Sequence, residues 1–318
     1  MIGAARGLAA GVPAMAVFEA QAEEAPAISA EPLAGSSFVE VLGTRMHYVE
    51  AGEGDPIVFL HGQPTSSYLW RNVMPLLQDQ GRVIAPDLIG FGRSDRPALD
   101  YTFQTHAAHL AAFMDALDLR NVTLVVHDWG SMLGLNWARL NPERVRAVAM
   151  MEPLTAPTFP MAKIEDFGPF ADMFRAFRDP ETGPVMLMER NAFIEQVLPA
   201  SILRELSEPE MAAYRAPFPE GSDRTPLLRW PNELPIGGAP ARNVEVFEAV
   251  NAWLETSQTP KLLIYFEPGA LAPRAAALWM RERFANLEIR YGGAGLHFVQ
   301  EDQPRAIGLL TADWLAGL

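Results

Sequence analysis

Short apolar runs that alternate with helix-like stretches place the strongest limit on how this chain can fold. Each run is four to seven residues long and is followed within two residues by Gly or a polar side chain. Such runs are typical of strands that are buried on both faces. Their alternation with helices predicts an α/β fold with a mostly parallel central sheet flanked by helices. The runs are Ile57–Leu60, Val83–Leu88, Val122–Val126, Val145–Met151, Lys261–Phe266 and Leu287–Tyr291, and a hairpin of Phe38–Leu42 and Arg45–Glu50 precedes them.

Residues 155–236 interrupt this alternation. They hold 12 of the 27 prolines and 7 of the 17 phenylalanines, and their candidate helices, 164–178 and 191–198, are short. A solvated loop has no use for so many aromatic rings, so we interpret the stretch as an inserted helical cap rather than a surface excursion. The main domain then comprises residues 37–154 and 237–318. In parallel sheets ligands bind beyond the carboxyl ends of the strands, where we expect the site.

The formal net charge of −14 argues against nucleic acid or an anionic membrane surface as a partner. No apolar run approaches the roughly 18 residues that span a bilayer, so we expect no integral membrane association. The chain has no cysteine, which excludes disulfides, cysteine-bound zinc and thiol nucleophiles. Residues 1–36, rich in Ala, Gly, Pro and Glu, are expected to form an extension. We expect a soluble, cytoplasmic protein, or a periplasmic one if residues 1–22 are a cleaved signal.

The segment Val125–Ser131 lies where a predicted strand passes sharply into a helix. A nucleophile elbow at such a turn needs small residues two positions before and after the nucleophile, because the backbone is crowded there. Centring the elbow on Asp128 places Val126 and Gly130 at these positions, whereas Ser131 would have large side chains there. An ionised carboxylate attacks a saturated carbon without a base and gives an ester that is hydrolysed afterwards. The alternative is that Asp128 only caps the helix.

Hydrolysis of such an ester needs a base that activates water, and His297 is the best placed of the six histidines. It follows the last predicted strand in a Gly-rich loop that can carry the imidazole over the elbow. A carboxylate must orient this histidine, and Glu152 and Glu267 both follow a predicted strand directly, so the residues leave the choice open. We expect His61 to hold the loop after its strand in shape, and the other histidines to lie in the core or at the surface.

Six blocks of the sequence, taken in order, are similar to one known family. The chain resembles the haloalkane dehalogenases of the α/β-hydrolase superfamily over roughly residues 37–318. It is most similar to the branch that includes the hexachlorocyclohexane-degrading enzymes. The blocks are His61–Pro75 (HGQPTSSYLWRNVMP), Asp87–Asp95 (DLIGFGRSD), Val125–Ser131 (VVHDWGS), Asn191–Pro199 (NAFIEQVLP), Glu267–Leu271 (EPGAL) and His297–Asp302 (HFVQED).

The resemblance implies roles for five residues. Asp128 is the nucleophile, His297 the base and Glu152 the acid. The indole N–H of Trp129 binds the departing halide, and the backbone N–H groups of Trp129 and Gln63 hold the oxyanion during ester hydrolysis. The family usually has Asn, whose amide is the second halide donor, where this chain has Gln63. Because Gln offers the same N–H donors but reaches one methylene further, we expect retained activity with altered halide binding.

The resemblance also implies that the cap roofs a cavity for a small apolar halogenated substrate, with a halide ion as a product. No metal or organic cofactor is implied, because water is the only co-substrate. The oligomeric state stays open between monomer and dimer. For each residue implied to line the cavity, ordinary core packing is the alternative. These residues are Phe170, Phe174, Phe193, Val197, Trp230 and Leu234 from the cap, and Leu154, Leu271 and Phe298 from the main domain.

Other proteins of this fold share parts of the pattern. Epoxide hydrolases need acidic donors from the cap, usually two tyrosines, and residues 155–236 contain only Tyr214. Fluoroacetate-type dehalogenases place an Arg after the nucleophile, where this chain has Trp129. Coelenterazine luciferases carry a similar triad, and the sequence separates them poorly from dehalogenases. A non-catalytic ligand-binding protein is a further alternative, which the intact Asp, His and Glu disfavour.

Overall fold

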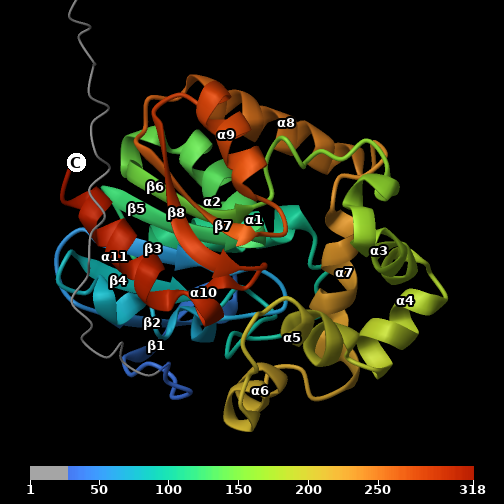
Figure 1. Cartoon of the computed structure of the whole chain (residues 1–318). Helices are drawn as coiled ribbons and strands as arrows, with labels where there is room; N and C mark the ends of the chain where they lie inside the picture. The colour runs from blue at the N-terminus through green and yellow to red at the C-terminus, as the bar shows by residue number, and fades with distance from the viewer. Residues whose placement is uncertain (1–27) are drawn as a thin grey trace, which may run out of the picture.

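A computed structural model of the chain describes residues 28–318 (Figure 1). Its centre is one eight-stranded sheet in the order β1-β2-β4-β3-β5-β6-β7-β8, in which β1 and β2 form an antiparallel hairpin and the strands from β4 to β8 are parallel. Every predicted run overlaps a strand, so the predicted α/β fold is confirmed. The strands are β1 (Ser36–Val41), β2 (Thr44–Ala51), β3 (Pro56–Leu60), β4 (Arg82–Pro86), β5 (Val122–Asp128), β6 (Val145–Pro153), β7 (Lys261–Pro268) and β8 (Leu287–Gly295).

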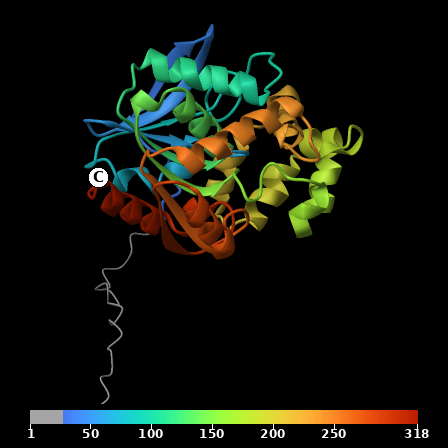
Figure 2. The same ribbon diagram turned by 90° about the horizontal axis from the view of Figure 1, so that it is seen from above.

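Helices cover both faces of the sheet (Figure 2). α1, α2 and α8 lie together on one face, and α11 lies on the other. The inner strands β3 and β5 are buried along their whole length, because helices shield them from both sides. Within residues 28–318 no helix is long and apolar enough to cross a membrane. The α-helices outside residues 155–236 are α1 (Phe103–Ala116), α2 (Trp129–Leu140), α8 (Ala241–Thr256), α9 (Arg274–Arg283), α10 (Val299–Asp302) and α11 (Pro304–Leu315).

Residues 155–236, called the helical segment below, contribute no strand to the sheet and lie together on one side of it (Figure 1). Prolines inside its helices, such as Pro169 and Pro231, keep these elements short and irregular. The elements are η4 (Ile164–Phe170), α3 (Ala171–Arg178), α4 (Thr182–Pro184), the π-helical turns η5 (Val185–Glu189) and η6 (Phe193–Val197), α5 (Leu198–Ala200), α6 (Glu208–Arg215), η7 (Gly221–Arg224) and α7 (Thr225–Glu233). The predicted signal segment, residues 1–22, lies outside the described residues.

A buried cluster of charged side chains joins the helical segment to the rest of the molecule. The guanidinium of Arg71 donates to Glu301 and to Glu210 at 2.5–2.8 Å. Arg204 pairs with the same two carboxylates, and the hydroxyl of Tyr214 donates to Glu301. Arg71, Glu210 and Glu301 are at most 3% exposed. Because Glu210 and Tyr214 belong to α6 and Glu301 to α10, the cluster fixes α6 against the loop that carries the predicted base.

Candidate active site

The end of β5 has the strained backbone of a nucleophile elbow. Asp128 has φ 49° and ψ −129°, a conformation that residues other than glycine rarely adopt. Gly130 packs so closely behind the turn that a Cβ there would lie 2.2 Å from the carbonyl oxygen of Leu60. A Cβ on Gly62 would lie 2.0 Å from the carboxylate of Asp128. The two glycines therefore let neighbouring loops approach Asp128 and present its carboxylate at the edge of the sheet.

Ser131, the other residue on which the elbow could be centred from the sequence, has a structural role. Its hydroxyl donates to the backbone carbonyl of Asp128 at 2.5 Å and accepts from the backbone N–H of Leu154 at 2.9 Å. These two bonds tie the start of α2 to the residue that follows β6. The hydroxyl is buried and engaged, and the group that faces the open side of the turn is the carboxylate of Asp128.

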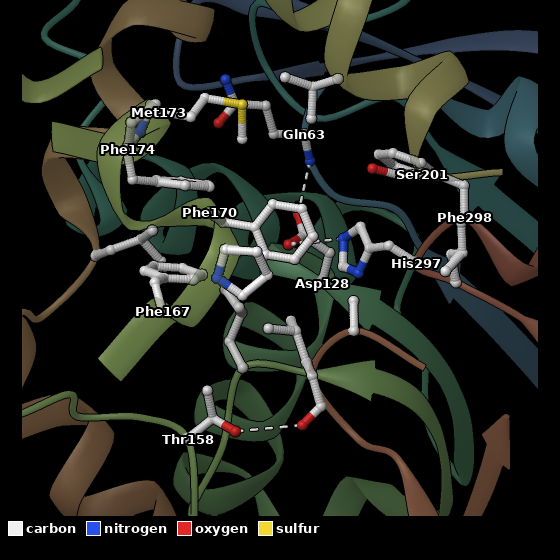
Figure 3. A pocket seen from close by; sticks show the side chains of 18 of the residues that line it. Gln63, Asp128, Thr158, Phe167, Phe170, Met173, Phe174, Ser201, His297 and Phe298 are labelled. Atoms are coloured by element: carbon white, nitrogen blue, oxygen red, sulfur yellow. Dashed lines mark hydrogen bonds and ion pairs between the residues drawn. The ribbon is translucent and has the colours of Figure 1, made fainter. Parts of the chain in front are cut away.

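The three predicted catalytic side chains meet at this edge, each from the end of a different strand. Nε2 of His297 lies 3.5 Å from Oδ2 of Asp128 (Figure 3), and its Nδ1 lies 3.3 Å from Oε2 of Glu152. Glu152 also accepts hydrogen bonds from three consecutive backbone N–H groups, residues 270–272, at 2.7–3.3 Å. Glu267 is exposed on β7. Of the two carboxylates that the sequence left open, the structure therefore brings Glu152 to the histidine.

The charges of these groups support one another. Burial by itself lowers the pKa of His297, but hydrogen bonds to Asp128 and Glu152 outweigh it and raise the pKa to about 9. Burial raises the pKa of Asp128, yet its hydrogen bond to His297 and the charge of that ring hold the pKa below its usual value. In the resting protein at neutral pH, Asp128 is therefore an anion paired with an imidazolium.

The loop that carries His297 is held from two sides. The backbone N–H groups of His297 and Phe298 both donate to the carbonyl of Ser201 in the helical segment, at 3.1 and 3.2 Å. On the other side, Nε2 of His127 donates to the carbonyl of His297 at 2.8 Å. Burial lowers the pKa of His127 to about 3, so this ring is neutral and carries its proton on Nε2, facing the carbonyl. The sequence did not reveal this support, because the two histidines lie far apart in the chain.

The two predicted halide donors lie on the cavity wall in different surroundings. Trp129 begins α2 and packs edge-on against Trp230, with ring centroids 5.0 Å apart. Gln63 lies in the loop after β3, where its backbone N–H donates to Oδ1 of Asp128 at 2.8 Å (Figure 3). The side-chain nitrogen of Gln63 donates to the carbonyl of Leu227 in α7, also at 2.8 Å. The amide is thus where the sequence places it, but one of its N–H groups is already engaged.

A cavity of about 360 Å³ opens over Asp128 and His297, between the helical segment and the main domain (Figure 3). Eight of the nine predicted lining residues are in its wall. Trp230 is the correction, because it is buried behind Trp129 and packs against His106 and Phe91 instead. The rotation of α7, which the sequence does not show, turns this indole into the core. The eight residues in the wall are Phe170, Phe174, Phe193, Val197, Leu234, Leu154, Leu271 and Phe298.

Several wall residues were not predicted. Phe167 stacks on Phe174 with ring centroids 4.4 Å apart, and Met173 lies in the wall near them (Figure 3). Thr158 is a polar member of the wall, and its hydroxyl donates to the carbonyl of Leu271 at 3.2 Å. That bond engages its one O–H group and makes the wall less polar than its composition suggests. The only sequence signal for these residues was the density of Phe and Met in the helical segment.

The other histidines do not line the cavity. The backbone N–H of Leu88 donates to Nε2 of His61 at 3.0 Å, so this ring holds the loop after β3 in shape, as the sequence predicts. His47 is buried against Asp87, with Nδ1 2.7 Å from the carboxylate. Both histidines of α1 are buried as well. His297 is therefore the one histidine ring in the wall of this cavity among residues 28–318.

The cavity also lacks groups that other chemistries need. Its wall contains no tyrosine from residues 28–318, and Tyr214 of the helical segment is bound to Glu301 instead. An epoxide hydrolase would need acidic hydroxyl donors over the nucleophile, so this arrangement disfavours that reaction. In the same part of the chain, no group of three or more His, Cys, Asp or Glu side chains is arranged to hold a metal ion.

Comparisons with known proteins show the family to which the chain is similar. A family model described as the alpha/beta hydrolase fold matches residues 55–304. A haloalkane dehalogenase of Agrobacterium fabrum is 44% identical over 280 residues, which cover 87% of this chain and 90% of the relative. One of Sphingobium indicum is 46% identical and covers 92% of this chain and 98% of the relative. The crystal structure of the haloalkane dehalogenase DbeA from Bradyrhizobium elkani is 44% identical, with a TM-score of 0.86 over 89% of this chain and 97% of that one.

Proposed function

The chain belongs to the haloalkane dehalogenases of the α/β-hydrolase fold, and we propose that Asp128, His297 and Glu152 are the residues with which it hydrolyses carbon–halogen bonds. The reaction converts a haloalkane and water into an alcohol, a halide ion and a proton. One observation carries the assignment of residues. Carboxylate, imidazole and carboxylate follow one another at 3.5 and 3.3 Å, and the first two border an apolar cavity.

In the first step, a carboxylate oxygen of Asp128 attacks the carbon that bears the halogen, from the side opposite the halogen. The new carbon–oxygen bond forms as the carbon–halogen bond breaks, the configuration at carbon inverts, and the halide leaves with the electron pair. The indole N–H of Trp129 is the proposed donor to this halide, because Trp129 lies in the wall next to the nucleophile. A fixed donor in a site that excludes bulk water stabilises the growing negative charge best. The amide of Gln63 is the second predicted donor.

The second step depends on what alkylation does to His297. Burial lowers the pKa of His297, and the hydrogen bond to the Asp128 carboxylate is the largest effect that raises it. Once Asp128 is a neutral ester, it no longer opposes the effect of burial on His297. The pKa of His297 then falls, and the ring loses its proton to the solvent. Nε2 then takes a proton from the water that attacks the ester carbonyl, while Glu152 stabilises the imidazolium.

The tetrahedral intermediate of ester hydrolysis carries a negative oxygen that must be stabilised. The backbone N–H of Gln63 already donates to the Asp128 carboxylate in the resting protein, and the adjacent backbone N–H of Trp129 helps to lower the pKa of that carboxylate. They are the proposed oxyanion donors, since the oxyanion forms on the same carboxyl group. Collapse of the intermediate releases the alcohol and restores the carboxylate of Asp128.

The test is halide release from 1-bromobutane, 1,2-dibromoethane and 1-chlorohexane at about pH 8, with Asp128→Ala as the control. The wild-type protein should release halide continuously, and the variant should lose at least about 10⁴-fold of that rate because the nucleophile is gone. Full activity in the variant would remove Asp128 from the mechanism. Styrene oxide is run alongside, and opening of the epoxide without halide release would indicate an epoxide hydrolase.

We further propose that residues 155–236 act as a cap on the main domain of residues 37–154 and 237–318, since residues of both line the cavity. We also propose that the protein is located in the cytoplasm. Fractionation of cells that express the full chain tests it, and recovery with periplasmic markers would contradict it.

A further inference from the structure

A proline inside α7 leaves one carbonyl group of that helix without its usual partner. In an α-helix the carbonyl of residue 227 accepts a hydrogen bond from the N–H of residue 231. Residue 231 is Pro231, which has no N–H. The side-chain nitrogen of Gln63 donates to the carbonyl of Leu227 instead, at 2.8 Å. Because Leu227 is fully buried, an unpaired carbonyl here would be costly, and Gln63 removes that cost.

This contact fixes which way the amide of Gln63 faces. A carbonyl oxygen only accepts hydrogen bonds, so the amide nitrogen points to α7 and the amide oxygen points elsewhere. Within residues 28–318 no donor reaches Oε1 of Gln63, and this atom is not fully buried. Because Gln63 is only 4% exposed and lines the cavity, the surface that Oε1 keeps faces the cavity. The amide therefore presents an acceptor to the substrate, and an acceptor repels a halide ion.

The length of the Gln63 side chain makes the contact possible. An Asn side chain is one methylene shorter, and its amide nitrogen would stop beyond hydrogen-bonding distance from the carbonyl of Leu227. The same backbone N–H at position 63 would still reach Asp128, so the extra methylene affects the side-chain amide alone.

We propose that Gln63, Leu227 and Pro231 form an amide latch that engages one N–H group of Gln63 and turns the amide oxygen, rather than the nitrogen, toward the leaving halide. This inference rests on the proposed function, since it concerns the halide site beside Asp128. With the latch closed, the second N–H group of the amide lies beside Oε1, whose repulsion of the halide opposes donation from it, so Trp129 is the main side-chain donor. Chloride has the most concentrated charge of the three common leaving halides and loses most from a missing donor. The latch is thus a specificity-determining device that favours bromide and iodide as leaving groups.

Pro231→Ala tests the latch, because the N–H of the new residue competes with Gln63 for the carbonyl of Leu227. Once released, the amide of Gln63 can turn its nitrogen into the cavity. Dissociation constants for chloride and bromide are measured by titration of tryptophan fluorescence, and kcat is measured by halide release from 1-chlorohexane and 1-bromohexane. Halide binding should tighten roughly tenfold, with the larger gain for chloride, and the bromide-to-chloride ratio of kcat should fall.

Two further variants separate the latch from a general effect on α7. Pro226→Ala is the matched control, since Pro226 stands in the first turn of the same helix, where no helical carbonyl uses the N–H. It should leave halide binding as it is. In a Gln63→Met background, which keeps the side-chain length without an amide, Pro231→Ala should add nothing. An equal gain in that background would overturn the latch, and so would unchanged or weaker halide binding in the Pro231→Ala variant.

A measurement on the wild-type protein does not depend on how the variants fold. With nitrogen-15 in glutamine and tryptophan side chains, added bromide should move the indole proton of Trp129 downfield in the NMR spectrum. The amide protons of Gln63 should stay in place, and a downfield shift with the same midpoint would overturn the latch. If the latch is overturned but the enzyme still releases halide through Asp128, the proposed function stands. Failure of the proposed function would appear as absent halide release in the wild-type protein.

Discussion

The floor and the roof of the cavity are held together by different interactions. At the floor, formed by Asp128, Glu152 and His297, each residue is hydrogen-bonded through its side chain or its backbone to a neighbouring loop or strand. The roof, formed by the cavity-facing side chains of the helical segment, is mostly apolar and includes the stacked rings of Phe167 and Phe174. Hydrogen bonds are directional, whereas apolar packing tolerates rearrangement. We therefore expect the floor to set the reaction and the roof to set which substrates reach it.

This difference predicts how each region responds to mutation. A change at the floor removes a defined group from a defined step, so its effect on turnover should be large and similar for every substrate. A change in the roof removes contacts that neighbouring side chains partly replace, so its effect should be small and should depend on the substrate.

The largest effect after loss of the nucleophile is expected for Glu152→Gln. A neutral amide cannot stabilise the imidazolium that forms during ester hydrolysis, so kcat should fall by about 10³–10⁴-fold. Steady-state halide release measures it. Glu267→Gln is the matched control, because Glu267 is exposed and should leave kcat within about twofold. The reverse outcome would assign the acid to Glu267.

The next largest effect is expected at the buried charged cluster that joins the helical segment to the main part of the molecule. Arg71→Met leaves the buried carboxylates of Glu210 and Glu301 with one guanidinium in place of two and should lower the free energy of unfolding by about 3–5 kcal/mol. Urea unfolding measures this change. Arg120→Met removes an ion pair in which both side chains are more than 70% exposed, and it should leave the stability nearly unchanged. Equal stabilities of the two variants would mean that the buried cluster does not hold the regions together.

A smaller effect is expected on the titration of His297, followed by histidine NMR. In the wild-type protein the ring should titrate near pH 9. In Asp128→Asn, a neutral analogue of the alkylated enzyme, the pKa should be clearly lower, because burial then acts with less opposition. A pKa that stays near 9 in the variant would contradict the switch from imidazolium to base.

The same raised pKa makes a prediction for stability. A group whose pKa is higher in the folded state stabilises that state fully below its unfolded pKa, which is 6.5 for histidine. This contribution is lost as the pH rises through about 9. Between these values the wild-type protein should therefore lose more unfolding free energy than Asp128→Asn does.

The smallest effect is expected in the roof. Phe170 is 40% exposed in the wall of the cavity, so Phe170→Ala removes few buried contacts. The ratio of kcat/KM for 1-chlorohexane and 1,2-dibromoethane should change a few-fold, with kcat for the shorter substrate nearly constant. Phe38→Ala, at an equally exposed ring on β1, is the control. A large loss of turnover on both substrates would show that the roof takes part in the chemistry.

The comparison also explains which residues could be predicted from the sequence. Asp128 and His297 follow strands, and a strand end in a parallel sheet has a known place in space. Glu152 and Glu267 both meet that condition, so the sequence could not choose between them. Glu152 is selected by the loop at residues 270–272, whose backbone N–H groups turn toward its carboxylate, and this turn leaves no local sequence signal.

The roof was less predictable because a residue's place there depends on helix rotation and on distant neighbours. Trp230 was expected in the cavity wall, but α7 turns it toward Trp129 and the core. The position of Gln63 was predicted, whereas its engagement by Leu227 was not. That contact arises because Pro231, far away in the chain, frees a carbonyl that only the folded structure brings within reach.

The covalent mechanism is tested most directly by the intact mass of the His297→Phe variant after incubation with 1-bromobutane. Asp128 should still displace bromide, but water is no longer activated. Each chain should release about one bromide, gain the mass of one butyl group and then stop, with the butyl group on the peptide that contains Asp128. Continued turnover, or release of bromide without a stable adduct on Asp128, would contradict the assignment of Asp128 as nucleophile and His297 as base.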